Sequence, residues 1–189
     1  RAIAPLTTDA PVITLRHLIT MTAGFPEDNP WGDRQLDVSP ADLRAFIRSA
    51  LSLSNAPGIG YEYSNLGFAL LGHVISQVSG EPYQRYITRE ILAPLGMKDT
   101  RWEFAEVPAD KLALGYRTAG TGWQLEPLLH DGSYGAMGGL ITTLNDFAHY
   151  VSLHLAAWPA RNEPDRGLIR RATLREMHKP AEISGLTAN

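Results

Sequence analysis

Hydrophobic residues recur every three or four positions in the first part of the chain, which is the spacing of one face of an α-helix. The stripe of Leu15, Leu18 and Ile19 predicts a helix over residues 15–22. Thr14 is a suitable N-cap for this helix, and Gly24 is placed to close it. The first element is therefore expected to be a short amphipathic helix.

Two further helices have clearer start signals. Ser39 and Pro40 predict an N-cap and a first helical residue, followed by an apolar face of helical period that consists of Leu43, Phe46, Ile47, Ala50 and Leu51. After a loop at residues 57–60 and an extended piece at residues 61–63, Ser64 and Asn65 are both good caps for a third helix. That helix is expected to stop at Gly80 and to turn inward Leu66, Leu70, Leu71, Val74, Ile75 and Val78.

The second half of the chain mixes helices with a hairpin. Pro82 predicts the start of a fourth helix, whose inward face is Tyr83, Tyr86, Ile87 and Ile91. Residues 112–117 and 123–125 are expected to pair across a five-residue loop, and the glycine-rich stretch 132–139 to be an irregular loop. Thr143 is expected to cap a helix with Asp146 completing a variant capping box; a last helix is expected at residues 169–177. The buried face predicted for the helix after Thr143 is Phe147, Val151 and Leu155.

The predicted fold is therefore mainly α with a small β-hairpin, in one lobe over residues 1–189. Hydrophobic residues make up 44% of the chain and charged residues 20%, as in ordinary globular proteins. The net charge is −3 and there is no basic stripe, so nucleic acid is not an expected partner. No apolar run approaches the ~20 residues that a membrane span requires. Because the chain has no cysteine, it has no disulfides, thiolate metal sites or cysteine nucleophiles.

Common catalytic signatures are missing. The chain has no Gly-x-Ser-x-Gly nucleophile elbow and no His-Glu-x-x-His zinc motif. His149 and His154 are five residues apart, which places them on different faces of a helix. We therefore expect neither a metal nor an organic cofactor.

The candidate chemistry lies in Tyr63-Ser64-Asn65. Two interpretations are open from the residues alone: an aromatic anchor followed by two capping residues, or a catalytic Tyr-x-Asn. The Asn65 side chain can reach a substrate only if Ser64 takes the cap. His17 is expected to satisfy nearby backbone rather than to act as a catalyst.

Several blocks of sequence in a fixed order carry a resemblance to a known family. They run from Ile13-Thr14-Leu15-Arg16-His17-Leu18 to Gly24-Phe25-Pro26, then through Pro57-Gly58 and Tyr63-Ser64-Asn65 to Val78-Ser79-Gly80, Pro94-Leu95-Gly96-Met97 and Gly138-Gly139-Leu140. This series, which covers roughly three quarters of the chain, resembles the class C serine β-lactamases and the related D-Ala-D-Ala carboxypeptidases and esterases. The resemblance implies the helical lobe of a two-lobed α+β serine hydrolase.

The resemblance also implies roles for the motif residues. In that family a Ser-x-x-Lys supplies the nucleophile, and a Lys-Thr-Gly or His-x-Gly on a strand binds the substrate carboxylate. Tyr63 would exchange protons with the Ser-x-x-Lys pair, and the Asn65 amide would orient the lysine and the substrate. A tyrosine phenol ionises only near pH ~10 in reference peptides, so it becomes a base only beside cations, which the other two motifs would supply.

Both companion motifs are expected outside residues 1–189. No serine has a lysine three positions later, since Lys98, Lys111 and Lys179 are preceded at that distance by Leu95, Pro108 and Glu176. His130-Asp131-Gly132 spells His-x-Gly, but it precedes the Gly138-Gly139-Leu140 block instead of following it, and we interpret it as a coincidence. The chain is thus interpreted as a fragment without its nucleophile helix and sheet strands.

The predicted function is that of part of a serine hydrolase, inactive by itself, that acts through an acyl-enzyme on β-lactam, D-amino-acid peptide or ester substrates. The alternative is a non-catalytic relative that kept the fold for binding; an unrelated helical interaction module would leave the ordered blocks unexplained. For the whole protein we expect a small-molecule or peptide substrate and a periplasmic or secreted location. We also expect the chain to self-associate through the apolar face that the missing helix would leave uncovered on Leu66, Leu70, Leu71, Val74 and Val78.

Overall fold

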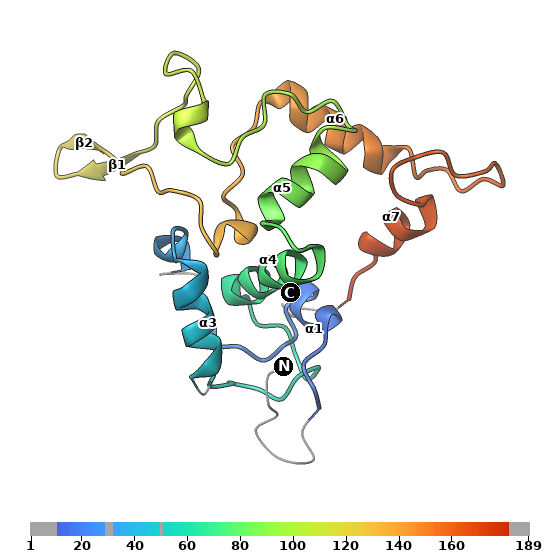
Figure 1. Cartoon of the computed structure of the whole chain (residues 1–189), viewed down its shortest axis with the longest axis horizontal. Helices are drawn as coiled ribbons and strands as arrows, with labels where there is room; N and C mark the ends of the chain where they lie inside the picture. The colour runs from blue at the N-terminus through green and yellow to red at the C-terminus, as the bar shows by residue number, and fades with distance from the viewer. Residues whose placement is uncertain (1–10, 29–31, 50, 182–189) are drawn as a thin grey trace, which may run out of the picture.

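The computed structural model describes residues 11–28, 32–49 and 51–181 (Figure 1). The helices are α1 Leu15–Ile19, α3 Pro40–Arg48, α4 Asn65–Ser79, α5 Tyr83–Ile87, α6 Leu144–Leu155 and α7 Arg171–Met177. A π-helix, η2 Thr88–Leu92, follows α5, and there are short 3-10 turns at η1 Asp33–Gln35, η3 Phe104–Glu106 and η4 Gly135–Met137. The strands are β1 Tyr116–Ala119 and β2 Gly122–Leu125. The prediction of a mainly helical lobe with one hairpin is confirmed.

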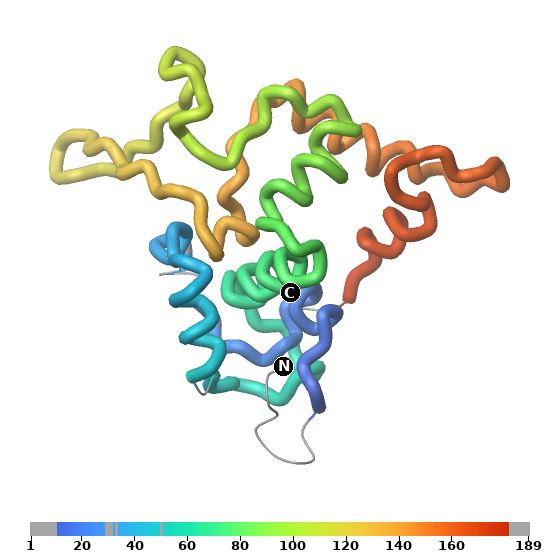
Figure 2. Tube along the Cα trace, in the orientation of Figure 1, coloured from blue at the N-terminus to red at the C-terminus, as the bar shows by residue number. Residues whose placement is uncertain are grey.

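Helix α4 is the centre of the fold. It packs against α1, α5 and η4, and the core around it comprises Leu18, Ala23, Phe25, Leu43, Leu66, Ala69, Leu70 and Tyr134. Gly72 lets η4 approach closely, because a Cβ at that position would lie 2.7 Å from the Cβ of Ala136. Figure 2 shows the hairpin and the α6–α7 segment extending away from this centre on opposite sides.

The predicted helix starts are confirmed by their hydrogen bonds. Thr14, Ser39, Ser64 and Thr143 are the N-caps of α1, α3, α4 and α6, and each side-chain oxygen accepts a backbone N–H from the third residue beyond it. Gly80 closes α4 with a φ of +74°. Capping chemistry is local, which is why the sequence predicts it well.

The extents of α1 and α3 differ from the prediction. Helix α1 ends at Ile19, because Met21 has a φ of +55° and turns the chain out of the helix. Helix α3 ends at Arg48, so Leu51 lies beyond it, and Ala50 is outside the described residues. On α3 the predicted face is buried at Leu43 but exposed at Phe46.

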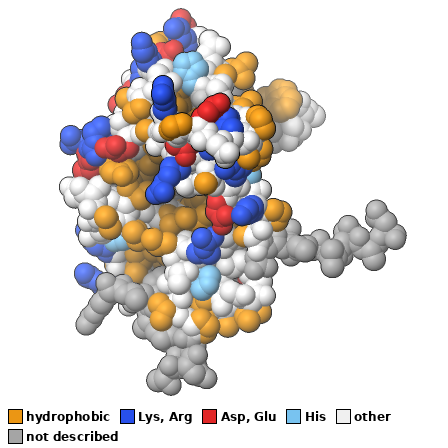
Figure 3. All heavy atoms as spheres, turned by 90° about the vertical axis from the view of Figure 1, so that its right-hand side faces the viewer, with side chains coloured by type: hydrophobic (Ala, Val, Ile, Leu, Met, Phe, Trp, Pro, Cys, Tyr) orange, Lys and Arg blue, Asp and Glu red, His pale blue; other side chains and the backbone are white. Residues whose placement is uncertain are grey.

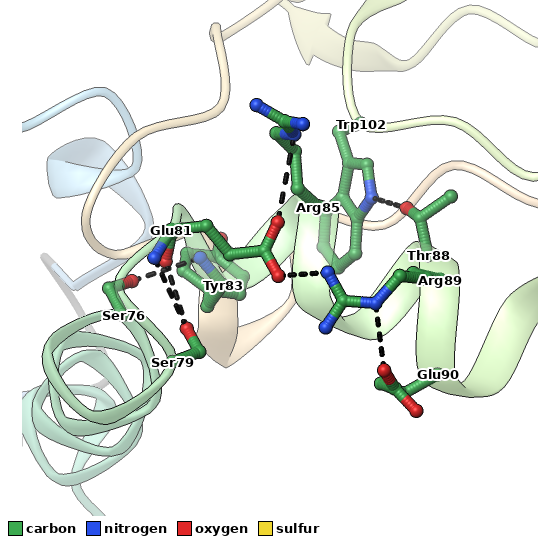
Figure 4. Close-up of polar contacts among 9 residues, drawn as sticks. All are labelled: Ser76, Ser79, Glu81, Tyr83, Arg85, Thr88, Arg89, Glu90 and Trp102. Carbon is green, nitrogen blue, oxygen red and sulfur yellow. Dashed lines mark hydrogen bonds and ion pairs between the residues drawn. The ribbon is translucent and has the colours of Figure 1, made fainter.

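The start of α5 depends on side chains that the sequence pattern did not single out (Figure 4). Pro82 occupies the N-cap position without a capping side chain, and the Tyr83 N–H donates instead to the Ser76 hydroxyl at 2.9 Å. The Glu81 carboxylate forms ion pairs with Arg85 and Arg89. The Trp102 indole donates to the Thr88 hydroxyl and meets the Tyr83 ring edge-on, with the ring centroids 5.5 Å apart. These contacts fix the corner between α4 and α5.

The hairpin has a shorter loop than predicted. The strands pair in an antiparallel register in which Thr118 faces Trp123 and Ala119 faces Gly122, so only Gly120 and Thr121 connect them. Gly120 has a φ of +61°, which a two-residue hairpin turn favours. The prediction of a five-residue loop was therefore wrong, because cross-strand pairing also includes Thr118, and Ala119 and Gly122 despite the weak strand propensity of alanine and glycine.

The predicted buried face of α6 is also wrong. Phe147, Val151 and Leu155 are 48%, 39% and 67% exposed, and Leu144 on the same stripe is 85% exposed. The four side chains do lie on one face of the helix, as their helical spacing predicted, but in the described part of the chain no element covers this face. The Asp146 carboxylate, instead of completing a capping box, turns inward to accept the Asp99 N–H and the Thr100 hydroxyl.

The sequence predicted that an apolar stripe of α4 would be left uncovered, and this is confirmed only near the C-terminal end of the helix. Leu66 and Leu70 are buried, whereas Val78 is 84% exposed. Figure 3 shows apolar side chains reaching the surface across the middle of the face turned toward the viewer. In the described ranges, no helix combines the length and the apolar character needed to cross a bilayer.

Candidate active site

The loop that carries Tyr63 is attached to the segment that follows α1. The Glu62 N–H donates to the Met21 carbonyl at 2.9 Å, and the Gly58 N–H donates to the Thr22 carbonyl at 2.8 Å. The Ser54 N–H reaches the Gly24 carbonyl at 2.9 Å. Two of the sequence blocks that carried the resemblance therefore lie side by side, although more than 30 residues separate them along the chain.

Two backbone conformations make this attachment possible. Gly24 has a φ of +81°, and a Cβ at this position would lie 2.1 Å from the Asn55 carbonyl oxygen. Only glycine fits this close approach. Met21 is the single non-glycine residue with positive φ in the described chain, and its conformation directs its carbonyl at the Glu62 N–H.

The Glu62 side chain closes the other end of the loop. Its carboxylate accepts hydrogen bonds from the Ser54 hydroxyl, from the Asn55 amide at 2.9 Å and from the Glu27 N–H at 3.0 Å. The Ser54 hydroxyl is the largest of the influences that hold the pKa of Glu62 below its ordinary value. Tyr63 thus follows a residue fixed on both its backbone and its side chain.

The first turn of α4 is capped by the hydroxyl of Ser64 and the carboxylate of Asp28, not by the side chain of Asn65. Ser64 accepts the Gly67 N–H at 3.2 Å, and the buried Asp28 carboxylate accepts the Asn65 N–H at 2.7 Å and the Leu66 N–H at 2.9 Å. The sequence predicted that the Asn65 side chain can reach a substrate only if Ser64 is the N-cap, and Ser64 is the N-cap. The Asn65 side chain is therefore not needed to cap the helix.

The Asn65 side chain is instead joined to Tyr63. The Tyr63 hydroxyl donates to Asn65 Oδ1 at 3.2 Å, and the pair is half-buried at Tyr63 and buried at Asn65. Gly32 lies against the amide, since a Cβ there would be 2.3 Å from Asn65 Nδ2. The structure thus brings the two predicted site residues together as a phenol and an amide in one hydrogen-bonded pair.

Asp28 and Glu62 were not among the residues predicted from the sequence. Asp28 precedes Asn65 by 37 residues, so no local pattern connects them. One indirect signal existed: α4 has no acidic residue in its own first turn, where a helix dipole favours an anion. A distant carboxylate fills that role.

The other candidates take structural positions. His17 Nδ1 accepts the Thr14 N–H at 3.3 Å, as expected for a backbone-satisfying residue. In His130-Asp131-Gly132, the exposed His130 lies 3.1 Å from a Glu103 oxygen, while Asp131 accepts the Tyr83 hydroxyl and the Gln84 amide. Burial raises the pKa of Asp131, and burial followed by the Asp131 charge raises the pKa of Tyr83.

The histidines of α6 also face protein groups. His149 Nδ1 lies 2.7 Å from the Leu95 carbonyl oxygen, and His154 Nδ1 lies 2.9 Å from His178 Nε2. Among the residues that the structure describes, three or more metal-binding side chains nowhere come together.

Comparison with known proteins identifies the class to which this fold and loop belong. The structure is similar to an octameric penicillin-binding protein homologue from Pyrococcus abyssi, with a TM-score of 0.72 and 28% identity over 97% of this chain and 42% of that one. It is also similar to the D-amino acid amidase from Ochrobactrum anthropi SV3, with a TM-score of 0.60 and 25% identity over 77% of this chain and 43% of the other. These similarities define the helical lobe of a β-lactamase and penicillin-binding-protein fold.

The sequence comparisons give the family. The beta-lactamase family matches residues 3–188. The D-alanyl-D-alanine-carboxypeptidase/endopeptidase AmpH of Escherichia coli (strain K12) is 31% identical over 159 residues, which are 82% of this chain and 40% of that protein. The chain belongs to the beta-lactamase family, whose members are serine hydrolases, and it spans about two fifths of the length of these relatives.

Proposed function

We propose that this chain is the helical lobe of a serine hydrolase that attacks a carbonyl group, forms an acyl-enzyme and releases it with water. Tyr63 and Asn65 are its contribution to the catalytic site. The observation that carries the proposal is the Tyr63–Asn65 pair itself, at 3.2 Å, on a loop whose backbone and caps are held by other residues.

Tyr63 has the chemistry of a proton-transfer group. Its hydroxyl would take a proton from the serine nucleophile during attack and return one to the leaving group. It requires neighbouring cations to do so, and we propose that these come from the Ser-x-x-Lys and strand motifs in a longer protein of which this chain is a part. The hydrogen bond to Asn65 holds the phenol oxygen of Tyr63 in place without help from the cations of the other two motifs.

Asn65 has the chemistry of an orienting group. Its Oδ1 accepts from Tyr63, and its Nδ2, against which Gly32 lies, is the donor that we propose for a substrate carbonyl. Because Ser64 and Asp28 accept the first N–H groups of α4, the Asn65 side-chain amide is not needed as a helix cap and can bind a substrate.

The substrates we propose are D-amino-acid peptides or amides, β-lactams and small esters. The names of AmpH and of the D-amino acid amidase support the first of these classes. No step of this reaction requires a metal or an organic cofactor.

The 189-residue chain is expected to be inactive by itself, since loss of a nucleophile of this kind costs about 10⁶-fold in kcat. The purified chain should be assayed with a chromogenic cephalosporin and with p-nitrophenyl acetate. Saturable turnover that disappears in Tyr63→Phe would contradict the proposal, because the nucleophile would then lie within this chain.

We further propose that the chain self-associates. The exposed stripe of α6 and the exposed Val78 on α4 support this proposal, and the Pyrococcus abyssi homologue is octameric. A contiguous apolar surface of more than a few hundred Å² is uncommon on a monomeric protein.

A further inference from the structure

Asp28 is one of the most deeply buried side chains of the described chain, at 2% exposed, and it is a carboxylate. Burying a carboxylate is costly unless hydrogen bonds compensate for the lost water. Both of its oxygens are used: Oδ1 accepts the Asn65 N–H at 2.7 Å and Oδ2 accepts the Leu66 N–H at 2.9 Å. Two accepting oxygens are the pattern of an ionised carboxylate.

The partner of this charge is the end of a helix. In the described part of the chain, no Arg or Lys forms an ion pair with Asp28. The first N–H groups of the 15-residue α4 have no partner within the helix and form its positive dipole end, and its own first turn supplies no acidic residue. The charge also acts on the core, because burial followed by Asp28 raises the pKa of Tyr134 to about 12.

The same segment holds the Asn65 side chain from a second direction. The Gly32 N–H donates to the Asp28 carbonyl at 2.7 Å, which places Gly32 directly against the Asn65 amide. Asp28 therefore bears on Asn65 in two ways: its carboxylate accepts the Asn65 backbone N–H, and its carbonyl accepts the N–H of Gly32, which lies against the Asn65 amide.

We propose that Asp28 is a positioning residue of the Tyr63–Asn65 site, which frees the Asn65 amide by capping α4 in its place. This inference rests on the proposed function for its catalytic consequence. Without Asp28, the Asn65 and Leu66 N–H groups would be left without acceptors. Asn65 Oδ1 would then compete for nearby N–H groups, as asparagine side chains do at helix starts, and would leave Tyr63.

The test compares Asp28→Asn and Asp28→Ala with a matched control, Asp146→Ala. Asp146 is also buried and also accepts a backbone N–H, from Asp99, together with the Thr100 hydroxyl. Its loss should destabilise the fold in a similar way without touching α4. Asp28→Asn keeps the side-chain volume and one acceptor, so it remains informative if Asp28→Ala fails to fold.

The first measurement needs no enzyme activity. NMR of the 189-residue chain should show the Asn65 and Leu66 amides exchanging roughly 10- to 100-fold faster in Asp28→Asn, since the acceptor that remains is neutral and can serve only one of the two N–H groups. The Asn65 side-chain NH₂ signals should move to the positions they have in Tyr63→Phe, and the double variant should add no further change. Unmoved Asn65 side-chain signals in Asp28→Asn would overturn the inference.

The second measurement is kinetic and uses the longer protein with p-nitrophenyl acetate. Asp28→Asn should lower kcat by up to about 100-fold, because small displacements of a positioned group have effects of this size. Its KM should stay within about threefold, as expected when only transition-state interactions are lost. Asp146→Ala should keep kcat; an equal loss of kcat in both variants would reduce Asp28 to a structural role.

The two proposals fail in different ways. If Tyr63→Phe keeps its kcat, the proposed catalytic site is wrong, and Asp28 is then judged by the Asn65 side-chain signals alone. If Tyr63→Phe loses kcat while Asp28→Asn keeps it, the site stands and the positioning role of Asp28 is overturned.

Discussion

Replacing Gly24 by alanine should destabilise the chain much more than the same replacement at Gly80. Both glycines have left-handed backbone, with φ of +81° and +74°. A Cβ at Gly24 would lie 2.1 Å from the Asn55 carbonyl oxygen, whereas no atom lies within 4 Å of a Cβ at Gly80. Gly80→Ala therefore reports the conformational cost alone, and Gly24→Ala reports that cost together with the clash.

The magnitudes follow from the contacts. A left-handed non-glycine residue costs about 1–2 kcal/mol, and this applies to both variants. To relieve the clash at Gly24, the loop at Ser54 and Asn55 must move away, which breaks the hydrogen bonds from the Ser54 N–H and hydroxyl to the Gly24 carbonyl at 2.9 and 3.3 Å. At about 1 kcal/mol for each lost bond, Gly24→Ala should cost about 3–4 kcal/mol in total.

Urea unfolding of the two variants and the wild-type chain, followed by circular dichroism, measures this difference. We expect the midpoint of Gly24→Ala to fall well below that of Gly80→Ala at a similar m-value. Equal midpoints would refute the reasoning, because the attachment of the Tyr63 loop to the segment after α1 would then not depend on the close approach at Gly24.

Two further predictions concern α6. Burial, and then the neighbouring His178, lower the pKa of His154 below its ordinary 6.5, so the unfolded chain binds more protons than the folded chain as the pH falls through that value. The free energy of unfolding, measured by urea titration, should therefore decrease from about pH 7 to about pH 5. His154→Asn should make this decrease smaller. The same dependence of the unfolding free energy on pH in His154→Asn and in the wild-type chain would contradict the prediction. Light scattering over a dilution series should show association through the exposed α6 stripe, which Leu144→Ser together with Leu155→Ser should weaken; a monomer at all concentrations that does not bind ANS would contradict it.

Helix starts and the Tyr-x-Asn motif could be predicted because their signals are local. Ser39, Ser64 and Thr143 cap helices through residues three positions away, and Tyr63 and Asn65 are two residues apart. A pattern of that length is visible in a single sequence. The ordered blocks also identified the family, which no single motif would have done.

What the sequence did not predict depends on contacts between distant segments. Asp28 reaches Asn65 across 37 residues, and Asp131 reaches Tyr83 across 48. The face of α6 was misassigned for a related reason. Hydrophobic period shows which side of a helix is apolar, but whether that side is buried depends on what packs against it.

The central claim is that Tyr63 transfers protons in a serine hydrolase, and the kinetics of Tyr63→Phe in the longer protein test it most directly. Tyr61→Phe is the matched control, because it removes the same hydroxyl from an exposed tyrosine two positions earlier. With p-nitrophenyl acetate as substrate, Tyr63→Phe should lower kcat by about 10²–10⁴-fold and change KM little, while Tyr61→Phe behaves as wild type. A Tyr63→Phe enzyme with near-native kcat would contradict the account, and Tyr63-Ser64-Asn65 would then be no more than an anchor and a helix cap.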